Sequence, residues 1–106
     1  MSSIFDIDKI ITRDWLVNEG WIKTMSFTEE RNPWWTKIFK GLTSNGATRD
    51  INFAYNDETN ELIHMKGFPY PKIDVETVCD VEVFISSQLK NYRPIQYLNE
   101  TYLIEK

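Results

Sequence analysis

Residues 49–55 read RDINFAY and carry the clearest strand signal in the chain. Ile51, Phe53 and Tyr55 fall on one face of such a strand, and the residues between them fall on the other. The next segment, NDETN at residues 56–60, has the composition of a turn, and ELIHMK at residues 61–66 follows it. Two strand-like segments joined in this way predict an antiparallel hairpin.

Weaker signals on both sides of this hairpin extend the sheet. Residues 21–27 alternate enough for a strand, and residues 34–40 are expected as another. The connection at residues 41–46 contains Asn45-Gly46, a strong turn signal. After residue 66, two prolines keep the segment 67–71 out of a central strand, because proline lacks the amide donor that a strand ladder needs.

Two helices are expected around these strands. The first covers about residues 6–19 and ends at Gly20, which can adopt the left-handed conformation of a helix C-terminus. Residues 77–90 carry conflicting signals, since their β-branched residues favour a strand whereas the apolar spacing from Val78 to Leu89 favours a helix. We expect a helix there, because Thr77-Val78-Cys79-Asp80 resembles a capping box.

The expected fold class is α+β. A mostly antiparallel sheet of about four strands would carry an N-terminal and a C-terminal helix packed on it. The tail after Pro94 would add a short strand near residues 102–104 or lie as extended chain. The length of 106 residues suits a single domain over residues 1–106.

The charge balance excludes some partners. The formal net charge is -4 and the pI is about 4.9. Because phosphate binding depends on an excess of Lys and Arg, we expect neither nucleic acid nor an anionic membrane as a partner. No apolar run approaches the roughly 20 residues that cross a bilayer, and the N-terminus does not resemble a signal peptide. The expected compartment is the cytoplasm, and the lone cysteine fits a reducing environment.

Residues for catalysis are scarce. The chain has one histidine and one cysteine, His64 and Cys79, and neither has a second residue of its kind to share a metal or a reaction. We therefore expect no cofactor, no metal and no enzymatic activity. The one catalytic alternative is a mechanism that uses carboxylates alone, near Asp50 or Asp57.

The candidate binding residues are aromatic and acidic. Trp34 and Trp35 are adjacent in an expected strand, so one indole should enter the core and the other should face outward, where tryptophan often dominates interface energetics. A group of carboxylates near the last helix would suit a basic partner, although a solvated helix start explains it as well. The predicted partner-binding residues are Trp34, Trp35, Asp74, Glu76, Asp80 and Glu82.

Three stretches carry a resemblance to a known group of proteins. They are ITRDWLVNEGW at residues 11–21, WWTKI at residues 34–38, and residues 73–84, where Thr77-Val78 precedes the last expected helix. The chain resembles small, uncharacterised α+β proteins encoded by bacteriophages and prophages of gut anaerobes. The resemblance implies an origin in a phage or mobile element, and no catalytic residues accompany it.

These observations together favour a non-enzymatic protein–protein interaction module. It would act as an inhibitor or accessory binding protein in the cytoplasm, that of the host cell if a phage encodes it. Two alternatives remain open. The chain could be a structural subunit of a virion or of a homo-oligomeric assembly, or an immunity-type inhibitor of a basic nuclease toxin.

Overall fold

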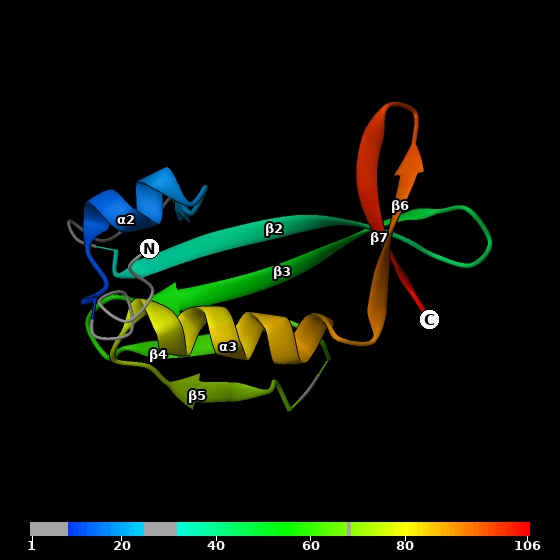
Figure 1. Ribbon diagram of the computed structural model, residues 1–106. Coiled ribbons are helices and arrows are strands. Elements are labelled where there is room, and N and C mark those ends of the chain that lie inside the picture. The colour runs from blue at the N-terminus through cyan, green and yellow to red at the C-terminus, as the bar shows by residue number, and fades with distance from the viewer. Residues whose placement is uncertain (1–8, 25–31, 68) are drawn as a thin grey trace.

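The computed structural model describes residues 9–24, 32–67 and 69–106 (Figure 1). Within these residues the chain forms two helices and seven strands. In chain order they are α2 (Arg13–Asn18), β1 (Ile22–Lys23), β2 (Trp34–Leu42), β3 (Thr48–Asn56), β4 (Glu61–His64), β5 (Lys72–Asp74), α3 (Val78–Leu89), β6 (Tyr92–Tyr97) and β7 (Glu100–Glu105).

The strands form one mixed sheet in the order β5-β4-β3-β2-β7-β6. The long β2–β3 hairpin is its centre, and all neighbours are antiparallel except β2 and β7. One edge of β2 is divided between two partners. β1 pairs with residues 35 and 36 near its start, and β7 pairs in parallel with Gly41 and Leu42 at its end. Among the described residues, no strand pairs with residues 37–40 along that edge.

The expected fold class, α+β with about four mostly antiparallel strands, is therefore wrong. The chain is mostly β, because the sheet gains β5 and a C-terminal hairpin of β6 and β7. Pro94 lies in β6, the outermost strand, where a missing amide donor is tolerated. The hairpin turns at Leu98 and Asn99, whose φ angles are 52° and 65°, so it uses a left-handed turn without the usual glycine.

Other expected elements are present but shorter. The predicted helix over residues 77–90 is confirmed as α3. Of the predicted helix at 6–19, the described part is helical only over Arg13–Asn18, and residues 6–8 lie outside the described residues. Of the predicted strand at 21–27, β1 contains two residues, and residues 25–27 lie outside the described part.

The hydrophobic core covers one face of the sheet. Alternation places Ile51, Phe53 and Tyr55 of β3 on this face, and all three are buried. Both helices pack there: α3 contributes Val78, Val81 and Phe84, and α2 contributes Trp15 and Leu16. We call this side of the sheet the covered face and the opposite side the open face.

The cover stops where α3 ends. Figure 1 shows α3 lying along β3 and β4, and the β6–β7 hairpin projecting from the end of the sheet at which α3 finishes. Gly41 is required at this junction, since a Cβ there would lie 2.2 Å from the Arg49 carbonyl oxygen. Lys40 donates to Glu100 across the same junction, which ties the hairpin to β2 by a surface ion pair.

Candidate protein-binding surface

The two adjacent tryptophans lie on opposite faces of β2, as the alternation predicted. Trp35 is 3% exposed and belongs to the core. Its indole N–H donates to Asp57 Oδ2 over 3.0 Å, and the Lys23 ammonium lies 4.8 Å from its ring centroid. Lys23 also pairs with Asp57 at 3.3 Å. Trp35 is thus the centre of a structural cluster and offers no surface to a partner.

Trp34 keeps part of its surface. It lies on the open face at the start of β2, opposite Asn56 of β3, and is half-buried. Asn32 holds the strand start in place, because its side-chain oxygen accepts from the Trp34 backbone N–H over 3.0 Å. Of the two predicted aromatic contacts, Trp34 is therefore the one that a partner could reach.

An apolar strip continues from Trp34 across the open face. Thr36 and Ile38 follow it on β2, and the register places Ile22 of β1 beside Thr36. Ile22 of the short strand β1 is 64% exposed and Ile38 of the central strand β2 is 50% exposed, although isoleucine is among the residue types most often buried. The strip consists of Ile22, Trp34, Thr36, Ile38, Ala54 and Ile63.

Carboxylates border the apolar strip at the β5 edge. Asp74 is paired in register with Glu61, and both lie on the open face, because the next residue of β4, Leu62, faces the core. Lys72 pairs with Glu61 at 3.3 Å, and Asp74 is exposed. Glu76 is also exposed and follows directly in the connection to α3. Glu61, Asp74 and Glu76 form what we call the acidic border.

The remaining predicted residues do not join this surface. Asp80 closes the capping box of α3: its Oδ2 accepts from the backbone N–H groups of Glu76, at 2.9 Å, and Thr77, at 3.1 Å. These hydrogen bonds hold the pKa of Asp80 below the ordinary value of 3.8. Glu82 is exposed on α3, on the covered side of the sheet. The predicted acidic cluster is thus divided between two sides of the molecule.

The residues with catalytic potential either take part in structural contacts or lie far from one another. His64 is 2% exposed, its ring stacks on Phe53 at 4.5 Å, and its Nδ1 lies 2.9 Å from Gln88 Oε1. Asp50 and Asp57 lie at opposite ends of β3, so they do not form a carboxylate pair. Cys79 is a free, partly buried thiol. Within the described ranges, no group of three or more metal-binding side chains comes together.

The sequence interpretation missed Ile22 and Ile38. The signal was present, because the alternation that exposes Trp34 also places Thr36 and Ile38 on the same side of β2. The sequence did not show that both helices pack on the same side of the sheet. Without that information, an isoleucine on the opposite side is interpreted as a core residue.

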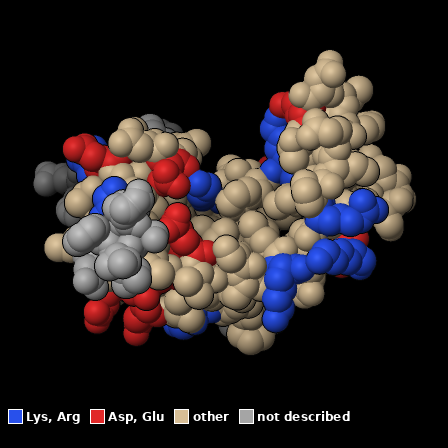
Figure 2. Space-filling model, viewed as in Figure 1, with Lys and Arg blue, Asp and Glu red and all other residues tan. Residues whose placement is uncertain are grey.

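Charge is unevenly distributed over the molecule. On the face shown in Figure 2, most Asp and Glu atoms lie toward the end where α3 begins, and most Lys and Arg atoms lie toward the hairpin end. The described cations at the hairpin end are Lys40, Arg49, Lys66, Lys90, Arg93 and Lys106, and the carboxylates there are Asp50, Glu100 and Glu105. The acidic border lies at the opposite end, on the far side of β3 from Trp34.

Over the part of the chain that the structure describes, no helix has both the length and the apolar character to cross a membrane. Comparison of the chain with protein-family models, with curated proteins and with solved structures finds no match.

Proposed function

We propose that this protein is a non-enzymatic interaction module that binds a basic protein partner through the open face of its sheet. The observation that carries the proposal is the exposed apolar strip from Ile22 to Ile63 with carboxylates along one border. Exposure of isoleucine side chains to water is unfavourable, and their burial against a partner would contribute favourable free energy to binding.

The open face combines an aromatic side chain, an apolar strip and a polar rim, as small protein-binding interfaces do. Trp34 is half-buried in a strand that is paired with β3 opposite Asn56, so its ring is already partly ordered before a partner arrives. An ordered aromatic side chain costs little conformational entropy on binding, and tryptophan is enriched among residues that dominate binding energy. Glu61, Asp74 and Glu76 then supply a polar rim.

The rim favours a basic partner. Carboxylates at the edge of an interface attract Lys and Arg side chains and raise the association rate more than the final affinity. The net charge of -4 acts in the same direction at longer range. An inhibitor or accessory protein would use the surface in this way, and an immunity-type inhibitor of a basic nuclease toxin is one form of it.

The alternative is assembly from copies of this chain. A structural subunit would bury the same apolar strip against a second copy, and the unpaired edge of β2 at residues 37–40 could add hydrogen bonds between copies. An origin in a phage or mobile element stays a prediction, because it depends on the sequence resemblance alone.

A pair of matched variants tests the proposal. The surface variant carries Ile38→Arg and Asp74→Lys, and the control carries Val83→Arg and Asp14→Lys. Ile38 and Val83 are 50% and 62% exposed, both aspartates are exposed, and the charge change is the same. Each variant and the wild type serve as bait in bacterial lysate, with mass spectrometry of what they retain.

The expected result is a basic protein that the wild type and the control retain at equal stoichiometry and the surface variant loses. Affinity measured with the purified partner should fall by at least about tenfold in the surface variant only. Retention by all three baits would contradict the proposal. Sedimentation of the wild type as an oligomer that the surface variant turns into a monomer would favour the alternative.

A further inference from the structure

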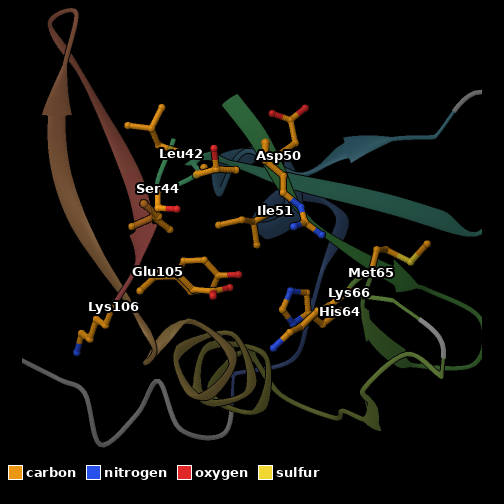
Figure 3. Close-up of a pocket in the computed structure, with 14 residues that line it drawn as sticks. Leu42, Ser44, Asp50, Ile51, His64, Met65, Lys66, Glu105 and Lys106 are labelled. Atoms are coloured by element: carbon orange, nitrogen blue, oxygen red, sulfur yellow. The ribbon is translucent and has the colours of Figure 1, made fainter. Parts of the chain in front are cut away.

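A cavity of about 430 Å³ lies on the covered face beyond the last turn of α3 (Figure 3). Gly41, Arg49, Ile51 and His64 from three neighbouring strands form its floor. Tyr92, Leu103 and Glu105 at the base of the hairpin form one wall. The remaining lining residues are Leu42, Thr43, Ser44, Asp50, Met65, Lys66 and Lys106. Cavities of this volume hold small organic molecules.

The cavity exists because the hairpin leaves the plane of the sheet. Residues that would be covered by a longer α3 are instead enclosed by Tyr92 and Glu105, which are paired across β6 and β7. On β3, Arg49 and Ile51 share the covered face, so the guanidinium belongs to the same side as His64. The structure therefore has a polar cavity at a place where the sequence pattern alone predicts an uncovered part of the sheet.

More positive than negative side chains line the cavity. Arg49, Lys66 and Lys106 line it, and among the described residues none of the three takes part in an ion pair. Figure 3 shows the Asp50 carboxylate and the Lys106 ammonium pointing away from the cavity, whereas His64 and Glu105 point into it. The groups that face a ligand are thus cationic in balance, with one carboxylate on the hairpin wall.

His64 is held as a rigid part of the floor. Its ring is almost fully buried, stacked on Phe53, and Nδ1 lies 2.9 Å from Gln88 Oε1, so the imidazole closes the floor of the cavity and cannot turn. The Tyr92 phenol on the hairpin wall is protonated at neutral pH, as a tyrosine of ordinary pKa is, and burial and then the nearby Glu105 carboxylate raise its pKa further. The walls therefore offer both donors and acceptors in fixed positions.

We propose that this cavity binds a small organic anion whose carboxylate or phosphate group is held by the Arg49 guanidinium. Arg49 supplies a planar pair of donors suited to either group, and Lys66 adds positive charge at the rim. Glu105 on the hairpin wall accepts hydrogen bonds from the polar remainder of the molecule, and the buried His64 ring forms the floor beneath it. The proposal does not depend on the protein-binding surface, which lies on the opposite face of the sheet.

Titration of the ¹⁵N-labelled protein, followed by amide chemical shifts, tests this site. The probes are inorganic phosphate, adenosine monophosphate and citrate, which separate phosphate from carboxylate recognition, with spermidine as a cationic control. Arg49→Gln is the test variant and Arg93→Gln is its match. Arg93 is an exposed arginine of β6 whose neighbours Tyr92 and Pro94 take the cavity side of the strand.

The expected result is a saturable shift with at least one anion, confined to the amides around Arg49, His64 and Glu105. Because the variant loses hydrogen bonds to a charged group, Arg49→Gln should weaken binding by about 10- to 100-fold, and Arg93→Gln should leave it unchanged. The unperturbed spectrum of Arg49→Gln away from the cavity shows that the variant is folded.

Three results would overturn the proposal. One is the absence of a saturable shift with any of the anions up to about 10 mM, a concentration at which even millimolar affinity is visible. The second is binding that survives Arg49→Gln. The third is an equal loss in both arginine variants, which would show attraction to surface charge in general.

Discussion

Replacement of Trp35 by phenylalanine separates the structural tryptophan from the exposed one. The ring of Trp35 is buried, and its N–H donates to Asp57 over 3.0 Å. A hydrogen bond to a charged group contributes about 1.5–3 kcal/mol. The lower end applies here, because Asp57 keeps its contact with Lys23 and is partly exposed to water. The phenyl ring is smaller than the indole, and the cavity that it leaves should lower the free energy of unfolding by about 1 kcal/mol more.

The free energy of unfolding should therefore fall by about 2–3 kcal/mol in Trp35→Phe. For a domain of this size the melting temperature would drop by roughly 10 °C. Trp34→Phe, the matched change at the neighbouring position, removes a half-buried ring from the open face and should cost under about 1 kcal/mol. Urea unfolding followed by far-ultraviolet circular dichroism measures both, since fluorescence itself changes when a tryptophan is removed.

A double-mutant cycle with Asp57→Asn tests the cause. If the indole–carboxylate bond matters, Trp35→Phe should cost less in the Asp57→Asn background than in the wild type, and the difference is the coupling energy. Equal unfolding midpoints for Trp34→Phe and Trp35→Phe would refute the division of the two faces. A coupling energy of zero would refute the assigned role of Asp57.

Three further changes probe other parts of the fold. Asp80→Asn should lower stability by about 1 kcal/mol at pH 7, because it removes the negative charge that strengthens the two return hydrogen bonds of the capping box; since the folded state depresses the Asp80 pKa, the wild type loses this contribution as the pH falls below 3.8, so the two stability curves should converge there. Gly41→Ala should cost about 1–3 kcal/mol by pushing the new methyl group against the Arg49 carbonyl, and a wild-type melting temperature would count against that contact. Leu98→Asn should raise the melting temperature by a few degrees, because asparagine tolerates the left-handed turn better than leucine, and a decrease would show that the leucine side chain stabilises the hairpin tip.

The sequence predicted the parts of the fold that local signals determine. The alternation at residues 49–55 and the turn after it located the β3–β4 hairpin. The capping box at Thr77 decided correctly between helix and strand for α3. The opposite placement of Trp34 and Trp35 followed from alternation alone and is confirmed by their burial.

What the sequence could not supply was the distant pairing. β7 joins β2 over two residue pairs, Gly41–Leu103 and Leu42–Ile104, and no local pattern links positions so far apart in the chain. The hairpin itself was hidden, because Pro94 argues against a strand unless its edge position is known, and Leu98-Asn99 lacks a glycine. The cavity depends on both features, so of its lining residues the sequence offered only Asp50, as a catalytic carboxylate, and did not predict the binding site.

The division of one β2 edge between β1 and β7 has a consequence for local unfolding. The hairpin of β6 and β7 keeps its own hydrogen bonds if it leaves the sheet, and detachment breaks the short parallel pairing, the Lys40–Glu100 ion pair and the contacts at its base. Segments of this kind exchange their amide hydrogens without global unfolding. The amides that join β7 to β2 should therefore exchange faster than those between β2 and β3, and a ligand in the cavity would slow that exchange by holding the hairpin against the sheet.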